Sequence, residues 1–334
     1  MKKIVLSLLF SLFIFFTYSQ VNLVLPSDVQ HSIDINSIVY SPSGNYILTA
    51  GSDNTAKLWS KNLELLYTIK GHSGIVNSAI FSPDEKLIVT SSQDKTLKIC
   101  DIETGEDIYI LDHEYEVMNA IFSSDSRFLI SVPSPNLTSV STIVVWDLTT
   151  GKPHSFLRDY PDNSFISTAC ISPDNSMIVT SYDNGNVIIW DDKGDKIYKY
   201  KIHTGRILDI EFTLDGKYIV SSGEDSKINI LRWQDGNLMH TLEGHMNYVI
   251  SICNSPDGKH ILSTSWDGTS KLWNIESGDL VCDFFIKEKR SAGLEACFSS
   301  DGEYVATAGI DKAAVWSVEN KETICVISAN SSSS

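Results

Sequence analysis

The chain has 334 residues, of which 42% are hydrophobic and 20% are charged. This composition excludes a disordered chain and one embedded in a membrane along most of its length. The formal net charge is −16, from 42 acidic and 26 basic residues. Because affinity for nucleic acid comes largely from Lys and Arg, the sequence predicts a folded protein that does not bind DNA or RNA.

The first residues have the three parts of an export signal. Lys2 and Lys3 form a positive start, residues 4–16 form an apolar run broken only by two serines, and Thr17 and Ser19 are small residues before Gln20. This pattern is typical of a secretory signal peptide. We expect cleavage after residue 19 and export to a periplasm or the medium. An uncleaved membrane anchor is the alternative, although the apolar run is shorter than the about 20 residues of a spanning helix.

The rest of the chain repeats seven times. In each unit a tight turn joins two apolar runs, as in a β-hairpin, and a third and a fourth run follow. Five units have a His ten residues before the first residue of the turn, and five have a Trp at one position of the third run. The turns begin at Ser41, Ser82, Ser123, Ser172, Thr213, Ser255 and Ser299. The histidines are His31, His72, His113, His203 and His245, and the third-run residues are Trp59, Cys100, Trp146, Trp190, Leu231, Trp273 and Trp316.

These repeats resemble the WD-repeat β-propeller family. The resemblance lies in Gly71-His72 and Gly244-His245, in an Asp before the third run, and in Trp146-Asp147 and Trp190-Asp191, and it extends over residues 21–328. It implies an all-β fold, a seven-bladed β-propeller of four-stranded antiparallel blades around a central channel.

The domain boundaries follow from these repeats. We expect a signal peptide over residues 1–19, the propeller over residues 20–328 and a disordered polar tail over residues 329–334. Both Val21–Leu25 and Glu322–Ile327 are suited to the outer strand of the seventh blade, and only one of them can occupy it.

Several repeats depart from the family pattern. Asp162 and Lys289 stand where the fourth and seventh units should have His, and Cys100 and Leu231 replace the Trp. The third unit lacks the Asp before its third strand and has a longer loop over residues 132–142. We expect the blade geometry to deviate locally at this loop.

We interpret the repeated histidines as structural residues rather than as metal-binding or catalytic ones. In the family, the His, the Asp before the third strand, a Ser or Thr of the second strand and the Trp form a buried network, because a buried carboxylate needs hydrogen-bond donors. Copies in different blades cannot converge on one metal ion or substrate. The resemblance implies such networks at His245, Asp267 and Trp273, at His31, Asp53 and Trp59, at His72 and Asp94, and at His203 and Asp225.

The cysteines have no metal-binding or redox spacing. No two of the six lie closer than 15 residues, so there is no CxxC motif. Cys170, Cys253 and Cys297 stand two residues before a turn, where we expect small core side chains. Cys282 and Cys325 fall on outer strands of adjacent blades, so a disulfide between them is an alternative to two free thiols.

Enzyme motifs are missing from the sequence, which has no GxSxG, HExxH, GxxxxGK[ST] or DxDxDG. The acidic stretch over residues 191–195 is interpreted as a solvated turn. We therefore expect no cofactor, metal site or catalytic residue, and predict an exported, monomeric, non-enzymatic scaffold for protein partners. The alternative is a propeller enzyme or small-ligand receptor with its site at the channel mouth, and a third hypothesis is a structural subunit of an envelope assembly.

The resemblance also indicates where partners dock. Propellers of this family commonly use the face formed by the start of the inner strand and the turn before the third strand. Trp, Tyr and Arg dominate binding hot spots. We predict a protein-binding face that includes Trp266, Tyr248, Arg206, Tyr115, Glu116 and Glu224. The alternative for Trp266 is that it only packs over the neighbouring blade.

Overall fold

The computed structural model describes residues 31–328, except residues 34, 63, 135–141, 160–163, 286–292, 300, 310 and 311. The predicted signal peptide, the candidate strand Val21–Leu25 and the tail after residue 328 therefore lie outside the described residues. So do Asp162 and Lys289, the two residues at which a repeat His is replaced.

The described residues form seven four-stranded antiparallel sheets, each made of four consecutive strands. This architecture is a seven-bladed β-propeller with four-stranded antiparallel blades, which confirms the predicted fold class. Within the described residues, nothing helical is long and apolar enough to cross a membrane.

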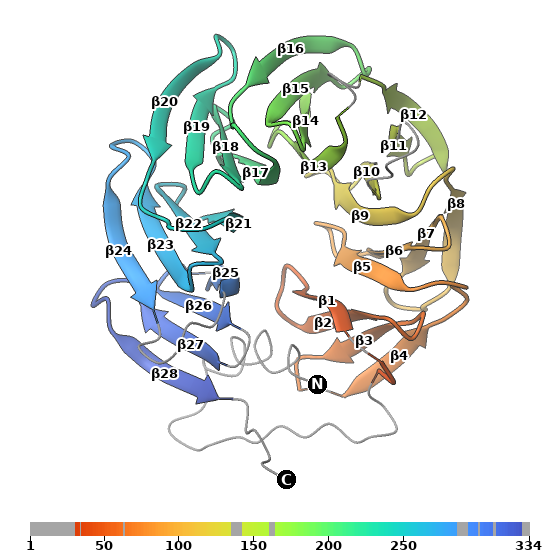
Figure 1. The fold of residues 1–334 in the computed structure, drawn as a ribbon. Coiled ribbons are helices and arrows are strands. Elements are labelled where there is room, and N and C mark those ends of the chain that lie inside the picture. Colours follow the sequence, from red (N-terminus) through yellow and green to blue (C-terminus); the bar gives the residue numbers. More distant parts are fainter. Residues whose placement is uncertain are drawn as a thin grey trace. The chain divides into compact units, whose positions relative to one another are not determined.

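The chain divides into two compact units, with the boundary after Asp159. The first unit contains blades 1–3, whose order along the chain can be followed in Figure 1. Blade 1 consists of β1 (Ile35–Tyr40), β2 (Tyr46–Gly51), β3 (Ala56–Ser60) and β4 (Leu65–Ile69); blade 2 of β5 (Val76–Phe81), β6 (Leu87–Ser92), β7 (Thr96–Asp101) and β8 (Asp107–Asp112); and blade 3 of β9 (Val117–Phe122), β10 (Phe128–Pro133), β11 (Ile143–Asp147) and β12 (Lys152–Leu157).

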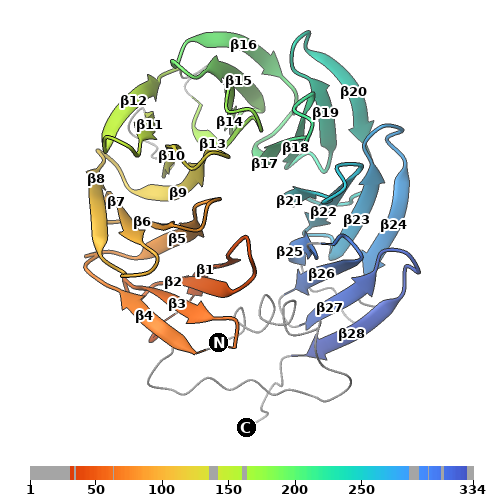
Figure 2. The ribbon, with the colours of Figure 1, turned by 180° about the vertical axis from the view of Figure 1, so that it is seen from behind.

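The second unit contains blades 4–7, and Figure 2 shows its fourth strands on the opposite side of each blade from its first strands. Blade 4 consists of β13 (Ile166–Ile171), β14 (Met177–Tyr182), β15 (Asn186–Asp191) and β16 (Lys196–Lys201); blade 5 of β17 (Ile207–Phe212), β18 (Tyr218–Gly223), β19 (Ile228–Arg232) and β20 (Asn237–Leu242); blade 6 of β21 (Val249–Asn254), β22 (His260–Ser265), β23 (Thr269–Asn274) and β24 (Leu280–Phe285); and blade 7 of β25 (Gly293–Phe298), β26 (Tyr304–Gly309), β27 (Lys312–Ser317) and β28 (Thr323–Ser328).

The repeated turn residues join the first two strands of each blade by side-chain hydrogen bonds. In blade 2, Ser82 Oγ donates to Asp84 Oδ1 over 2.7 Å and accepts the Leu87 amide over 2.9 Å. Glu85 adopts a left-handed backbone with φ 56°. The same Ser-to-Asp bond recurs in blades 3, 4, 6 and 7. The hydroxyl and the carboxylate therefore fix the hairpin that the sequence predicts at this position.

The core lies between successive blades. The second strand of blade 2 is buried over five of its six residues, because it packs on both faces. In the first unit, Leu48 and Leu58 of blade 1 share a buried cluster with Val76 and Phe81 of blade 2. Fourth strands have a neighbour on one side only, so they leave residues such as Leu66 and Ile108 exposed.

The described residues show which segment forms the fourth strand of blade 7. β28 pairs with β27 as the fourth strand of blade 7, so the C-terminal candidate segment occupies that position.

The cysteine predictions are right in part. Cys170 is buried and Cys253 is partly buried, as expected of core positions. The core prediction for Cys297 is wrong, because its side chain is exposed. In blades 4 and 6 the equivalent cysteine packs against a Phe of the next blade, whereas the second unit contains no blade after blade 7 to cover Cys297. Cys282 is a free thiol, and the side chain of Cys325, its candidate disulfide partner, lies outside the described residues.

Candidate functional site

Blade 6 has the full set of polar residues expected from the repeat pattern. His245 Nδ1 donates to Asp267 Oδ2 over 2.9 Å, and His245 Nε2 lies 2.8 Å from Ser263 Oγ. Trp273 Nε1 donates to the same Ser263 oxygen over 2.8 Å. Asp267 also accepts the Met246 amide over 2.8 Å and the Thr269 hydroxyl over 2.7 Å. The structure thus brings His245, Asp267 and Trp273 together.

Blades 1, 2 and 5 contain equivalent arrangements. His31, His72 and His203 lie within 2.9 Å of Asp53, Asp94 and Asp225, respectively. Their other ring nitrogens lie within 2.9 Å of Thr49, Thr90 and Ser221. Only blade 1 of these three adds a Trp, since Trp59 Nε1 donates to Thr49 Oγ1 over 3.0 Å. The four described networks belong to separate blades.

The electrostatics of the networks in blades 1 and 2 favour ionised aspartates and neutral histidines. Burial alone would raise the pKa of Asp94, but hydrogen bonds from Thr96, His72 and the Ser73 amide lower it to about 2. Burial lowers the pKa of His72 despite its bond to Asp94. A carboxylate without a proton can only accept, so His72 Nδ1 is the donor of their bond.

Blade 4 lacks the repeat His and contains a different chain of buried hydrogen bonds, which the sequence analysis did not predict. Trp190 Nε1 donates to Thr180 Oγ1 over 2.9 Å, and Thr180 Oγ1 donates to the Tyr182 hydroxyl over 3.2 Å. Tyr182 is fully buried at the end of β14. The equivalent residue is small in blades 1, 2, 5 and 6, as Gly or Ser. A large Tyr at a position where these blades have a small residue is the sequence feature that could have indicated this arrangement.

The blade 6 patch, defined as Met246, Tyr248 and Trp266, consists of two predicted docking residues and one exposed neighbour. Trp266 is 49% exposed, Tyr248 is 36% exposed and Met246 is 92% exposed. The Tyr248 and Trp266 ring centroids are 5.4 Å apart with an interplanar angle of 32°. The Trp266 amide donates to the Tyr248 carbonyl over 3.0 Å. The two aromatic residues therefore lie side by side in one blade, and Met246 was not singled out from the sequence.

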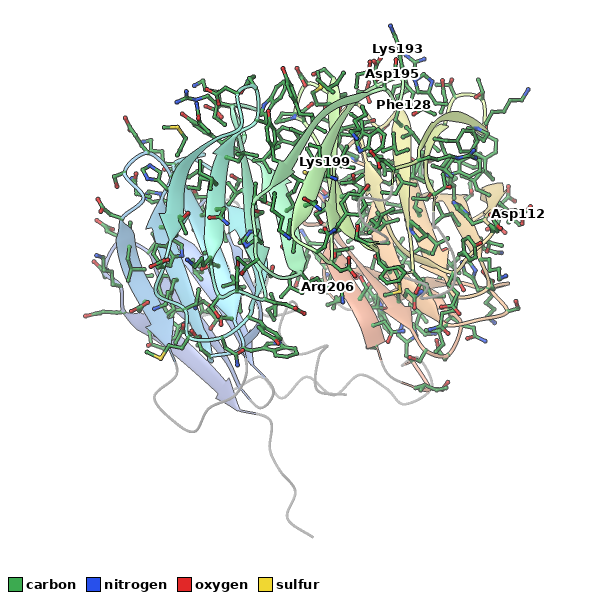
Figure 3. All side chains as sticks on the ribbon, turned by 45° about the horizontal axis from the view of Figure 1, so that its top comes forward. Asp112, Phe128, Lys193, Asp195, Lys199 and Arg206 are labelled. Carbon is green, nitrogen blue, oxygen red and sulfur yellow. The ribbon has the colours of Figure 1, made fainter. Side chains whose placement is uncertain are left out.

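The other predicted docking residues lie in two further places. Arg206 and Glu224 are neighbours in blade 5, where the Glu224 amide donates to the Arg206 carbonyl over 2.9 Å, and both are partly buried. Arg206 Nε also donates to Ser167 Oγ of blade 4 over 3.3 Å. Within the second unit, Arg206 lies at the opposite end of the blades from the turn of Lys193 and Asp195 (Figure 3).

Tyr115 and Glu116 belong to the first unit. The Tyr115 hydroxyl donates to Glu114 Oε1 over 3.0 Å, and the Glu116 carbonyl accepts the Ser134 amide over 2.7 Å. Tyr115 is partly buried and Glu116 is exposed.

The described residues offer little for metal chemistry. No three of their His, Cys, Asp or Glu side chains come together in a group that would hold a metal ion. The acidic stretch over residues 191–195 is a turn, in which Asp191 Oδ1 accepts the amides of Lys193 and Asp195 over 3.0 and 2.8 Å.

Four-stranded blades with His-Asp-Ser/Thr networks define a WD-repeat β-propeller. Models of known families agree: "WD domain, G-beta repeat" matches residues 25–60, 63–101 and 236–274, and "Anaphase-promoting complex subunit 4 WD40 domain" matches residues 169–252. The chain belongs to the WD-repeat family.

Similar proteins share parts of this chain. Apoptotic protease-activating factor 1 of Rattus norvegicus is 31% identical over 163 residues, which cover 48% of this chain and 13% of that protein. The ribosome biogenesis protein WDR12 homolog of Nematostella vectensis is 35% identical over 134 residues, 36% of this chain and 32% of that protein. Autophagy-related protein 16 of Arabidopsis thaliana is 26% identical over 177 residues, 50% of this chain and 33% of that protein. The matched region is thus a third or less of each relative.

Proposed function

We propose that this chain is an exported, monomeric and non-enzymatic scaffold that binds a protein partner through the blade 6 patch. The observation on which this rests is the pair of neighbouring, exposed aromatic side chains, Tyr248 and Trp266, with ring centroids 5.4 Å apart. Trp and Tyr are enriched among the residues whose truncation costs most binding energy.

The backbone around the patch is held in place before a partner arrives. The Asp267 carboxylate accepts the Met246 amide, and Asp267 directly follows Trp266. The Trp266 amide is bonded to Tyr248. A pre-ordered surface loses less conformational entropy on binding, so the buried His245–Asp267 pair supports a binding role by fixing the exposed residues beside it.

Family membership supports the scaffold role in general terms. WD-repeat propellers are typically non-catalytic proteins that bind other proteins, and the similar proteins named above are not named as enzymes. Arg206 and Glu224 of the adjacent blade 5 supply polar groups for the edge of the same interface.

A capture experiment with the full chain tests this function. Tagged wild-type protein, Trp266→Ala and Tyr248→Ala would be used to capture partners from the envelope and medium fractions, with co-purifying proteins identified by mass spectrometry. Phe156→Ala is the matched control, because Phe156 is an aromatic residue of β12 that is 47% exposed. We expect the two patch variants to lose a protein that wild type and control retain. Undiminished recovery with both folded patch variants would contradict the proposal.

A further inference from the structure

Successive blades of each unit contact each other at the ends of their first strands. The residue two positions before one blade's turn joins a cluster with the residue directly before the next blade's turn. We call each such contact a seam. Four seams contain one aliphatic or Cys side chain and one Phe: Val39 with Phe81, Ile80 with Phe122, Cys170 with Phe212, and Cys253 with Phe298.

The seam between blades 5 and 6 has a different chemistry. Glu211 takes the place of the aliphatic residue and Asn254 takes the place of the Phe. Asn254 donates to Glu211 Oε2 twice, from Nδ2 over 2.8 Å and from its amide over 3.2 Å. Asn254 Nδ2 also donates to the Phe212 carbonyl over 2.9 Å. Both members of the apolar pair are thus replaced by polar residues that bond to each other.

A second carboxylate crosses the same seam. Asp209 lies two residues before Glu211 on β17, and Asp209 Oδ2 accepts the Ile252 amide of β21 over 2.9 Å. Because side chains two apart lie on one face of a strand, both carboxyl groups reach β21 from the same face. Two hydrogen bonds to β21 amides therefore connect the blades here.

No cation faces Glu211 from the strands packed around it. β17 contacts β13, β14, β18 and β21, and these five strands contain no Lys, Arg or His. The charged or titratable neighbours are Asp209 on β17, Cys170 on β13 and Cys253 on β21. Asn254 Oδ1 is buried and has no hydrogen-bond partner among the described residues. The surroundings of Glu211 therefore contain polar groups but no charge that would compensate an ionised carboxylate.

We propose that the seam between blades 5 and 6 is a pH-responsive joint, which holds β17 against β21 while Glu211 is protonated and loosens when the opened seam releases that proton. This inference does not depend on the proposed binding function. The four apolar seams contain no carboxyl group. Their titratable groups are the thiols of Cys170 and Cys253, and burial favours the neutral form of both.

The direction of the pH effect follows from proton linkage. Burial, and then the charge of Asp209, raise the pKa of Glu211 to about 8, against the bonds from Asn254. In the opened seam Glu211 returns to its ordinary value of about 4.3. The closed seam thus binds a proton that the open one releases. The closed seam is therefore most stable below the ordinary Glu pKa of about 4.3. Its stability falls as the pH rises towards about 8 and is constant above that.

Hydrogen exchange of the full-length protein between pH 5.5 and 9 tests the joint, after correction for the intrinsic pH dependence of exchange. We expect the equilibrium constant for opening of β17 and β21 to increase by up to about tenfold for each pH unit, up to about pH 8. β5 and β9, which meet at the Ile80–Phe122 seam, are the control inside the same molecule.

Two variants separate ionisation from packing. Glu211→Gln keeps the shape and the hydrogen-bond acceptor but does not ionise, and the double variant Glu211→Val with Asn254→Phe restores the apolar pair of the other seams. We expect both to lose the extra pH dependence of β17 and β21. The joint would be refuted if wild-type β17 and β21 followed β5 and β9 at every pH, or if Glu211→Gln retained the extra dependence.

Discussion

At the scale of single residues, the repeat histidines of blades 1, 2, 5 and 6 use both ring nitrogens in hydrogen bonds. One nitrogen bonds to the Asp before the third strand and the other lies within 2.9 Å of a Ser or Thr hydroxyl. Neither nitrogen remains for a metal ion or a proton transfer to substrate. We therefore interpret these networks as structural, since each buried polar group has a partner.

The first prediction concerns the blade 6 network. Asp267→Ala removes the acceptor of four groups, the His245 ring, the Met246 amide, the Thr269 amide and the Thr269 hydroxyl. We expect a loss of about 3 kcal/mol in the free energy of unfolding, because breaking one partner of a buried pair leaves the others unsatisfied. Asp192→Ala, in an exposed turn, is the control and should change stability by less than about 0.5 kcal/mol. Equal melting temperatures for the two variants would refute the network assignment.

The second prediction concerns acid. The folded-state pKa of Asp94 is about 2 and lies below its ordinary value of about 3.9. The stabilisation by ionised Asp94 is therefore full above about pH 4 and is lost as the pH falls towards 2, and it amounts to about 2 kcal/mol. Denaturant unfolding of wild type and Asp94→Asn at several pH values measures it. The stability difference should shrink from pH 5 to pH 2, and a difference that stays constant would contradict the prediction.

At the scale of strands and blades, the sequence predicted the repeat number, the hairpins and the fold class, because turn residues and apolar runs are local signals. It named the His, Asp and Trp of the networks, but not their Ser or Thr partners. It also missed Tyr182, which bonds to Thr180 in blade 4. Glu211 and Asn254 were also missed. They lie in different repeats, and only packing of successive blades brings them together.

The third prediction concerns the last strand. β28 gives blade 7 its fourth strand by pairing with β27. A chain that ends at residue 322 lacks this strand and leaves the outer edge of β27 without hydrogen-bond partners. We expect it to be insoluble or to melt at least about 5 °C lower than a chain that ends at residue 328, which keeps every described strand. Thermal melting of the two chains compares them, and equal melting temperatures would show that β28 contributes nothing.

At the scale of the whole molecule, blades with the same core network present different residues at equivalent rim positions. The position of Trp266 is Ser52 in blade 1, Gln93 in blade 2 and Glu224 in blade 5, whereas the Asp that follows it is the same in all four blades. The family pattern thus predicts the shared core well. It gives no information on which rim residues are exposed together, which the structure supplies for Tyr248 and Trp266.

The fourth prediction concerns export. Residues 1–25 fused to a reporter that is active only outside the cytoplasm should make it active, because Lys2, Lys3 and the apolar run over residues 4–16 have the order of a signal peptide. N-terminal sequencing of the natural protein should find Gln20 as the first residue. A soluble cytoplasmic protein that still begins at Met1 would contradict export.

The most direct test of the binding account is the dissociation constant of the captured partner for purified wild type, Trp266→Ala and the control Phe156→Ala, measured by titration calorimetry. We predict that Trp266→Ala weakens binding by about 30-fold or more, the equivalent of about 2 kcal/mol for a hot-spot aromatic residue. The control should stay within about twofold of wild type. Binding by folded Trp266→Ala that is as tight as that of wild type would contradict the claim that partners dock on the blade 6 patch.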